Sequence, residues 1–210
     1  MQMEWQLNDA QNLALIDREI GDYKFSPAQY EIVRQVIYAT GDFEYKSLIR
    51  FSDRALPAGA AALAARSTII VDVPMVQVGI TVSIQKTFAN PVYCSADSNN
   101  WSHKDQSSSA AWEIETLARR YPEAIFVISQ GQAALTALLE LIEAEEIRPA
   151  LVIGTPAGFI DVDVAKQRLN DSNVPHIRID GRTGNAVVAT AIINGLVELA
   201  WQAYGHDEEG

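Results

Sequence analysis

The sequence predicts an α/β fold in a single domain, with a mainly parallel β-sheet, helices on both faces and a helical segment at the N-terminus. Two continuous apolar runs in the second half, at residues 124–128 and 150–153, and a third strand-like run at residues 176–179 indicate buried strands. Each run is followed by a turn of small residues and then by a stretch with helical periodicity. Strands that alternate with helices in this way are typical of a parallel sheet.

Composition supports a globular domain. The chain has 210 residues, 48% of them hydrophobic and 20% charged, which is enough apolar surface for a core. We expect residues 1–210 to form the domain and residues 206–210 to be a frayed tail.

The first third carries clear helix signals. Helices are expected over residues 9–20, ended by Gly21, and from Ser26-Pro27 to Gly41, with Pro27 at the first helical position. The alanine-rich segment from Arg54 to Arg66 is also expected to be helical.

The middle of the chain changes character. A β-branched run over residues 68–73 indicates a strand, and residues 82–84 and 91–94 are weaker strand candidates. The serine- and asparagine-rich stretch from Ser95 to Ser109 reads as a long loop, after which Ser109 caps a helix to about Arg120.

Charge and residue counts exclude several classes of function. The net charge of −11 argues against nucleic acid as a partner. The apolar runs are too short to cross a membrane and the N-terminus lacks a signal-peptide pattern, so we expect a cytoplasmic protein. With one cysteine and three separated histidines we expect no metal site, and without a glycine-rich phosphate motif we expect no nucleotide cofactor.

Three glycine-containing turns are candidate ligand sites, at residues 129–132, 154–158 and 181–184. Ligands of open α/β sheets bind at the carboxyl ends of the strands, where free N–H groups and helix dipoles attract anions. Arg182 either clamps a carboxylate or is an ordinary solvated arginine. Asp72 ends a strand, and we expect its carboxylate chiefly to cap the turn at residues 73–75. Met75 either lines a pocket or fills the core.

Several segments resemble the precorrin-8X methylmutases in order and spacing. Residues 36–45 resemble the helix end and turn that carry the catalytic histidine of that family, with Tyr38 at the histidine position. The match Asp72-x-x-Met75-x-x-x-Gly79-Ile80-Thr81 is the most specific. Residues 153–160 and 181–184 match the later turns. Departures include Gln11-Asn12, residues 129–133, Val164-Ala165 and residues 184–186.

The resemblance implies an isomerase of cobalamin biosynthesis that needs no cofactor. Such enzymes move a methyl group from C-11 to C-12 of precorrin-8X, giving hydrogenobyrinic acid, or act on the cobalt-containing equivalent, and are typically homodimers. It implies Tyr38 as the catalytic residue, in the role of hydrogen-bond donor to the ring. The implied substrate contacts are Asp72, Met75, Gly79, Thr81, Gly154, Pro156, Gly158, Gly181, Arg182 and Gly184.

Two further hypotheses stay open at this point. Because Tyr38 and several polar positions differ from the family pattern, the chain could be a non-catalytic corrinoid or tetrapyrrole binder that serves as carrier or regulator. It could also be an enzyme for another anionic substrate on the same α/β scaffold.

Overall fold

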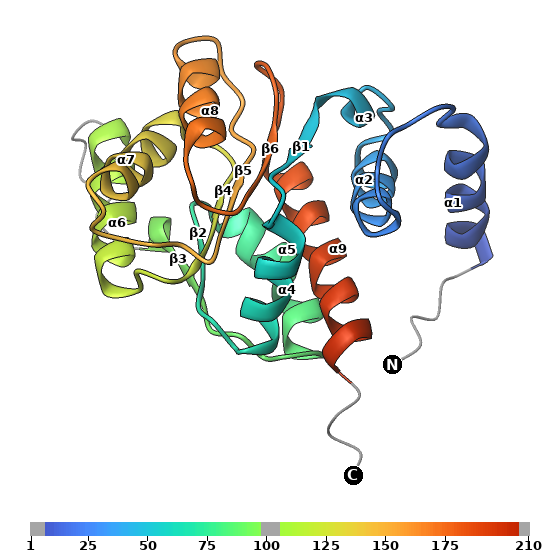
Figure 1. The fold of residues 1–210 in the computed structure, drawn as a ribbon, viewed down its shortest axis with the longest axis horizontal. Helices are drawn as coiled ribbons and strands as arrows, with labels where there is room; N and C mark the ends of the chain where they lie inside the picture. The colour runs from blue at the N-terminus through green and yellow to red at the C-terminus, as the bar shows by residue number, and fades with distance from the viewer. Residues whose placement is uncertain (1–6, 98–105, 206–210) are drawn as a thin grey trace.

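The computed structural model describes residues 7–97 and 106–205. Within these residues, six strands form one sheet in the order β1-β6-β5-β4-β2-β3. All neighbouring strands run parallel except β1, which pairs antiparallel with β6 at the edge (Figure 1). The strands are β1 (Ile49–Phe51), β2 (Ile69–Val71), β3 (Val92–Cys94), β4 (Ile125–Ile128), β5 (Leu151–Gly154) and β6 (His176–Ile179).

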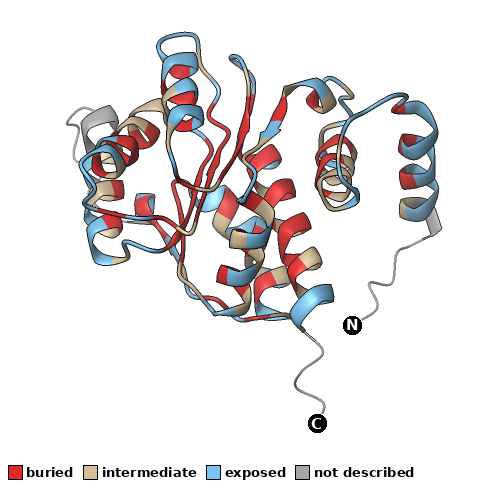
Figure 2. Cartoon of the chain, viewed as in Figure 1, coloured by how far each residue is buried: buried red, intermediate tan, exposed pale blue. Residues whose placement is uncertain are grey.

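Helices cover both faces of the sheet, as the sequence predicts. One face carries α4 (Ala55–Ala64), α5 (Pro74–Gln85) and α9 (Ala186–Tyr204), which pack against one another. The other face carries α6 (Gln106–Arg120), α7 (Gln132–Glu143) and α8 (Val162–Asp171). The two faces enclose separate apolar cores, and Figure 2 shows their buried residues on the sides that face the sheet.

The predicted N-terminal helical segment is confirmed as an outer layer of three helices. These are α1 (Leu7–Glu19), α2 (Pro27–Thr40) and the short α3 (Tyr45–Leu48). Helix α2 begins with a capping box between Ser26 and Gln29, and it ends at Gly41, whose φ of 69° suits glycine. It packs on α9 with one side and on α1 with the other.

Two predictions about local structure are wrong, and one strand was missed. Residues 82–84 are not a strand but belong to α5, where Val76, Ile80 and Ile84 are buried at helical spacing and Pro74 occupies the first turn. Helix α6 begins at Gln106 instead of Ser109. Strand β1 was not expected, because a three-residue strand offers too little pattern to detect.

Some predictions fall outside the described residues. Most of the expected loop, residues 98–105, and the expected tail, residues 206–210, lie there, as do His103 and His206. By length and composition α9 could cross a membrane, but 56% of its apolar window is buried inside the protein. Its packing on α2, α4 and α5 makes it the central core helix of its layer.

Candidate functional site

The carboxyl ends of the parallel strands place several candidate residues at one edge of the sheet. Asp72 follows β2, the turn at Ser129 follows β4, and the loops after Gly154 and Ile179 follow β5 and β6. This is the edge at which open α/β folds bind their ligands.

Asp72 holds together two neighbouring strand ends, and the residue is buried, with 7% exposed. Its two oxygens accept hydrogen bonds from the Ser129 hydroxyl and N–H at 2.8 Å, from the Gln130 N–H at 2.7 Å and from the Gly131 N–H at 3.4 Å. The prediction that Asp72 caps the next turn is wrong, because α5 has no side-chain cap. Instead, the carboxylate satisfies the free N–H groups that lead into α7.

The β5–α8 and β6–α9 loops are packed against each other. The Gly158 N–H donates to the Arg182 carbonyl at 3.1 Å. At Gly184 φ is 134°, and a Cβ atom there would lie 2.2 Å from the carbonyl oxygen of Thr155. Only glycine fits this approach. The structure therefore brings five predicted residues into this pair of loops, which we call the strand-edge loops: Gly154, Pro156, Gly158, Gly181 and Gly184.

Arg182 projects from these loops toward solvent, with 62% of its side chain exposed. Its guanidinium lies 5.9 Å from the ring centre of Phe159 and 3.8 Å from the Asp163 carboxylate. Phe159 and Ile160 are themselves 84% and 78% exposed. An exposed cation beside two exposed apolar side chains suits a ligand that is both anionic and hydrophobic.

The predicted residues of α5 make contacts within and between helices. A Cβ atom at Gly79 would lie 2.7 Å from the Thr190 side chain, so glycine allows α5 and α9 to approach closely. The Thr81 hydroxyl donates to the Gln77 carbonyl. Met75 is 65% exposed, which excludes the core role. Substrate contacts by these three residues remain predictions.

Tyr38 is not hydrogen-bonded to the strand-edge loops, because its hydrogen-bond partners, Asp9 and Asn12, lie on α1. Its hydroxyl donates a hydrogen bond to the Asp9 carboxylate. The pKa of Tyr38 is raised above its ordinary value. The hydrogen bond to Asp9 is the largest cause, and desolvation is the next. A tyrosine in this state holds its proton firmly, so it is suited to hydrogen bonding and poorly suited to proton release.

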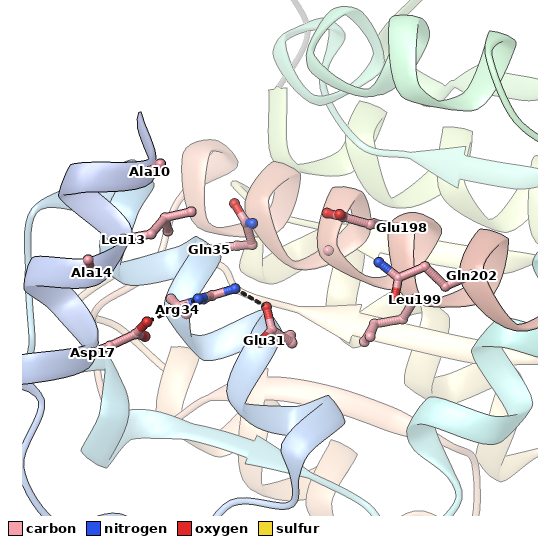
Figure 3. A pocket seen from close by; sticks show the side chains of 11 residues that line it. Ala10, Leu13, Ala14, Asp17, Glu31, Arg34, Gln35, Glu198, Leu199 and Gln202 are labelled. Carbon is pink, nitrogen blue, oxygen red and sulfur yellow. Dashed lines mark hydrogen bonds and ion pairs between the residues drawn. The ribbon is translucent and has the colours of Figure 1, made fainter. Parts of the chain in front are cut away.

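A cavity of about 510 Å³ lies between α1, α2 and α9 (Figure 3). Its charged lining consists of Asp17, Glu31, Arg34 and Glu198, and Arg34 binds both Asp17 and Glu31. Burial is the main cause that raises the pKa of Glu198, and the negative charge of the nearby Glu31 raises it further. Tyr38 lies one helical turn beyond Arg34 on α2 and is not among the residues that line this cavity.

Sequence reasoning missed Asp9 and Ser129 as contributors to these regions. Asp9 was expected only as the start of a helix, and Ser129 only as part of a turn. No local pattern marks them, because their partners lie 29 and 57 residues away in the chain. Among the described residues, no group of three or more His, Cys, Asp or Glu side chains could hold a metal ion.

The fold and the strand-edge loops define a class of protein: a parallel α/β domain that presents glycine-rich backbone and one exposed arginine at the carboxyl edge. Comparison with known proteins gives the family. The family model of precorrin-8X methylmutase matches residues 9–199. The chain belongs to this family.

Relatives that bear this family's name cover most of the chain. A cobalt-precorrin-8 methylmutase of Synechocystis is 36% identical over 206 residues, which span 91% of this chain and 94% of the relative. A precorrin-8X methylmutase of Pseudomonas aeruginosa is 34% identical over 176 residues, or 81% of this chain and 84% of the relative. The crystal structure of the Thermus thermophilus precorrin-8X methylmutase matches with a TM-score of 0.84 and 34% identity, over 94% of this chain and 99% of the other.

Proposed function

We propose that the protein is a methylmutase that moves a methyl group within a precorrin-8-type corrinoid, without a cofactor, in the cytoplasm. The observation that carries this proposal is the match to the methylmutase family over residues 9–199. We propose the cobalt-containing form as the substrate, because the Synechocystis relative bears that name.

The strand-edge loops are assigned to substrate binding in this proposal. The substrate ring carries several carboxylates, and the exposed guanidinium of Arg182 offers them charge and hydrogen bonds. The exposed side chains of Phe159 and Ile160 offer apolar contact to the ring. A protein with a net charge of −11 needs such a local site to attract an anion.

Tyr38 is assigned to catalysis as a hydrogen-bonding group. Its raised pKa argues against transfer of its own proton. A tyrosine hydroxyl has one proton to donate, and here Asp9 accepts it. Tyr38 would therefore donate to the ring in place of Asp9 and stabilise negative charge that develops there during migration. The methyl shift is intramolecular, so a bound and strained ring geometry can supply much of the remaining rate enhancement.

The first experiment follows the visible spectrum of cobalt-precorrin-8, and separately of precorrin-8X, after anaerobic incubation with the purified protein. Mass does not change in an isomerisation, but the conjugation of the ring does. We expect conversion of at least one substrate. A shifted spectrum that then stays constant would instead indicate a corrinoid binder, and no spectral change with either ring would refute both functions.

Tyr38→Phe tests the catalytic assignment. We expect it to abolish turnover, a loss of roughly 10²-fold or more, while the dissociation constant of the substrate stays nearly unchanged. Tyr30→Phe is a matched control, because Tyr30 lies on the same helix and donates to Asp17 of α1 in the same manner. Equal turnover in the two variants would remove Tyr38 from the mechanism.

We also propose a homodimer, with the outer face of α5 in the interface. Met75, Val78 and Val82 form an apolar stripe along this helix and are 65%, 73% and 60% exposed. Sedimentation velocity of Val78→Asp should show monomers where the parent protein shows dimers. Val164→Asp, at a 59% exposed valine on α8, should leave the dimer intact.

A further inference from the structure

Lys166 is a fully buried lysine at the strand edge, 1% exposed, on α8. Its Nζ atom donates hydrogen bonds to the carbonyl oxygens of Gly181 and Thr183, each at 2.8 Å. These two carbonyls lie on either side of Arg182. The ammonium group therefore holds the main chain of the β6–α9 loop at both neighbours of the exposed arginine.

The surroundings of Lys166 make its burial costly. Within the described residues no carboxylate lies within 4 Å of its Nζ atom. Burial lowers the pKa of Lys166 to about 8. The negative charge of Asp163 on α8 opposes this lowering, and the positive charge of Arg178 on β6 contributes to it. Glu143 of the adjoining α7 is bound to Arg168. A buried ammonium without an ion pair weakens the fold, which indicates a role other than stability.

The loop that Lys166 holds is coupled to the neighbouring loop. The Arg182 carbonyl accepts the Gly158 N–H, and Gly184 packs on the Thr155 carbonyl. The position of the Gly181–Gly184 main chain thus determines where the Arg182 side chain starts and how it meets Phe159.

We propose that Lys166 is a positioning residue for substrate binding: its ammonium fixes the Gly181–Gly184 loop so that Arg182 meets the carboxylates of the anionic ring. This inference rests on the proposed function for the identity of the ligand. The positioning itself is a property of the free protein and can be measured without any substrate.

The test compares Lys166→Met with the parent protein in two measurements. Hydrogen exchange without substrate should show roughly tenfold lower protection of the Gly158 amide, because the loop that accepts its hydrogen bond has lost its anchor. Steady-state kinetics should show the KM for the corrinoid raised roughly tenfold, with kcat changed less than about twofold. A lysine that serves only overall stability would not produce this division between KM and kcat.

Two further variants complete the design. Lys166→Gln keeps a neutral donor, so its KM and protection should lie between those of Lys166→Met and the parent. Arg168→Met removes a cation from the same helix without touching the loop, so both measurements should match the parent.

The outcomes separate this inference from the proposed function. Unchanged Gly158 protection in Lys166→Met would overturn the positioning role, whatever the protein binds. Loss of folding in both Lys166 variants, seen by circular dichroism, would also overturn it, because the lysine would then stabilise the whole domain. If Lys166→Met shows reduced protection of the Gly158 amide but the parent protein converts no corrinoid, the positioning role of Lys166 is supported and only the proposed function is refuted.

Discussion

The strand-edge loops and the α1–α2 layer are held together by different means. At the strand edge, buried side chains bind main-chain atoms: the Asp72 carboxylate accepts N–H groups of the next turn, and the Lys166 ammonium donates to carbonyls. Between α1 and α2, side chains bind side chains, as in the Tyr38–Asp9 and Tyr30–Asp17 pairs. The hydrogen bonds at the strand edge fix the path of the main chain in the loops. Those between α1 and α2 join side chains of two helices whose main chain is already fixed by helical hydrogen bonds.

This difference indicates which region tolerates change of chemistry. A side-chain pair on two helices can be replaced without moving the main chain. A carboxylate that organises a turn cannot be exchanged so freely, because its loss leaves several buried donors without partners. Loss of Asp72 or Gly184 at the strand edge should therefore affect stability, while loss of the Tyr38 hydroxyl between α1 and α2 should affect activity with little effect on stability.

Gly184→Ala should have the largest effect on stability. The added Cβ atom would lie 2.2 Å from the Thr155 carbonyl oxygen, and the φ of 134° is unfavourable for alanine. We expect a loss of about 3 kcal/mol or more in the free energy of unfolding, measured by urea denaturation. Gly181→Ala is the control: its φ is also positive, but no atom lies within 4 Å of its Cβ, so about 1 kcal/mol is expected. Equal losses would mean that the two loops move apart readily.

Asp72→Asn should have the next largest effect. An amide has one acceptor oxygen where the carboxylate has two, so the N–H groups of the β4–α7 turn lose partners or gain a competing donor. We expect a loss of about 2 kcal/mol in unfolding free energy.

Asp163→Asn provides the comparison for Asp72. This exposed carboxylate pairs with the exposed Arg182 and accepts no main-chain hydrogen bond among those of the described residues, so its loss should change stability by less than about 0.5 kcal/mol. If both substitutions cost the same, Asp72 would be no more than a surface acceptor.

How far the sequence predicts these two regions depends on the separation of the interacting residues. The start of α2 at Ser26 and its end at Gly41 were predicted, because capping signals lie within a few residues of each other. The alternation of strands and helices after residue 124 was predicted for the same reason. The Asp72–Ser129 contact spans 57 residues, and no local pattern encodes it.

Tertiary context explains the remaining errors. Residues 82–84 have the β-branched composition of a strand, yet packing of Ile80 and Ile84 against the core, with close approach to α9 at Gly79, favours the helix. Lys166 looks like an ordinary polar residue of a surface helix until the β6–α9 loop folds over it. The glycine turns themselves were visible in the sequence, but their mutual packing through Gly184 and Thr155 was not.

The pH dependence of stability gives a third prediction. The pKa of Lys166 is lowered from 10.5 to about 8 in the folded state, so the unfolded chain binds more protons between these values. Stability from this group therefore rises with pH in that window. Relative to Lys166→Met, the parent should gain about 1.4 kcal/mol of unfolding free energy between pH 7 and pH 9, measured by denaturation at each pH. A constant difference would mean that the lysine is solvated.

Ser26→Ala should have the smallest effect and completes the comparison. Ser26 and Asp72 both satisfy free N–H groups before a helix, but Ser26 acts on Gln29 of its own helix at an exposed site, where water can replace it. We expect a loss of about 1 kcal/mol by urea denaturation, with turnover unchanged, because the Tyr38–Asp9 pair lies at the other end of α2. Ser47→Ala, whose hydroxyl only donates to the Glu44 carbonyl, should cost less than about 0.5 kcal/mol. A loss from Ser26→Ala as large as that from Asp72→Asn would contradict the distinction between local caps and those that join two strand ends.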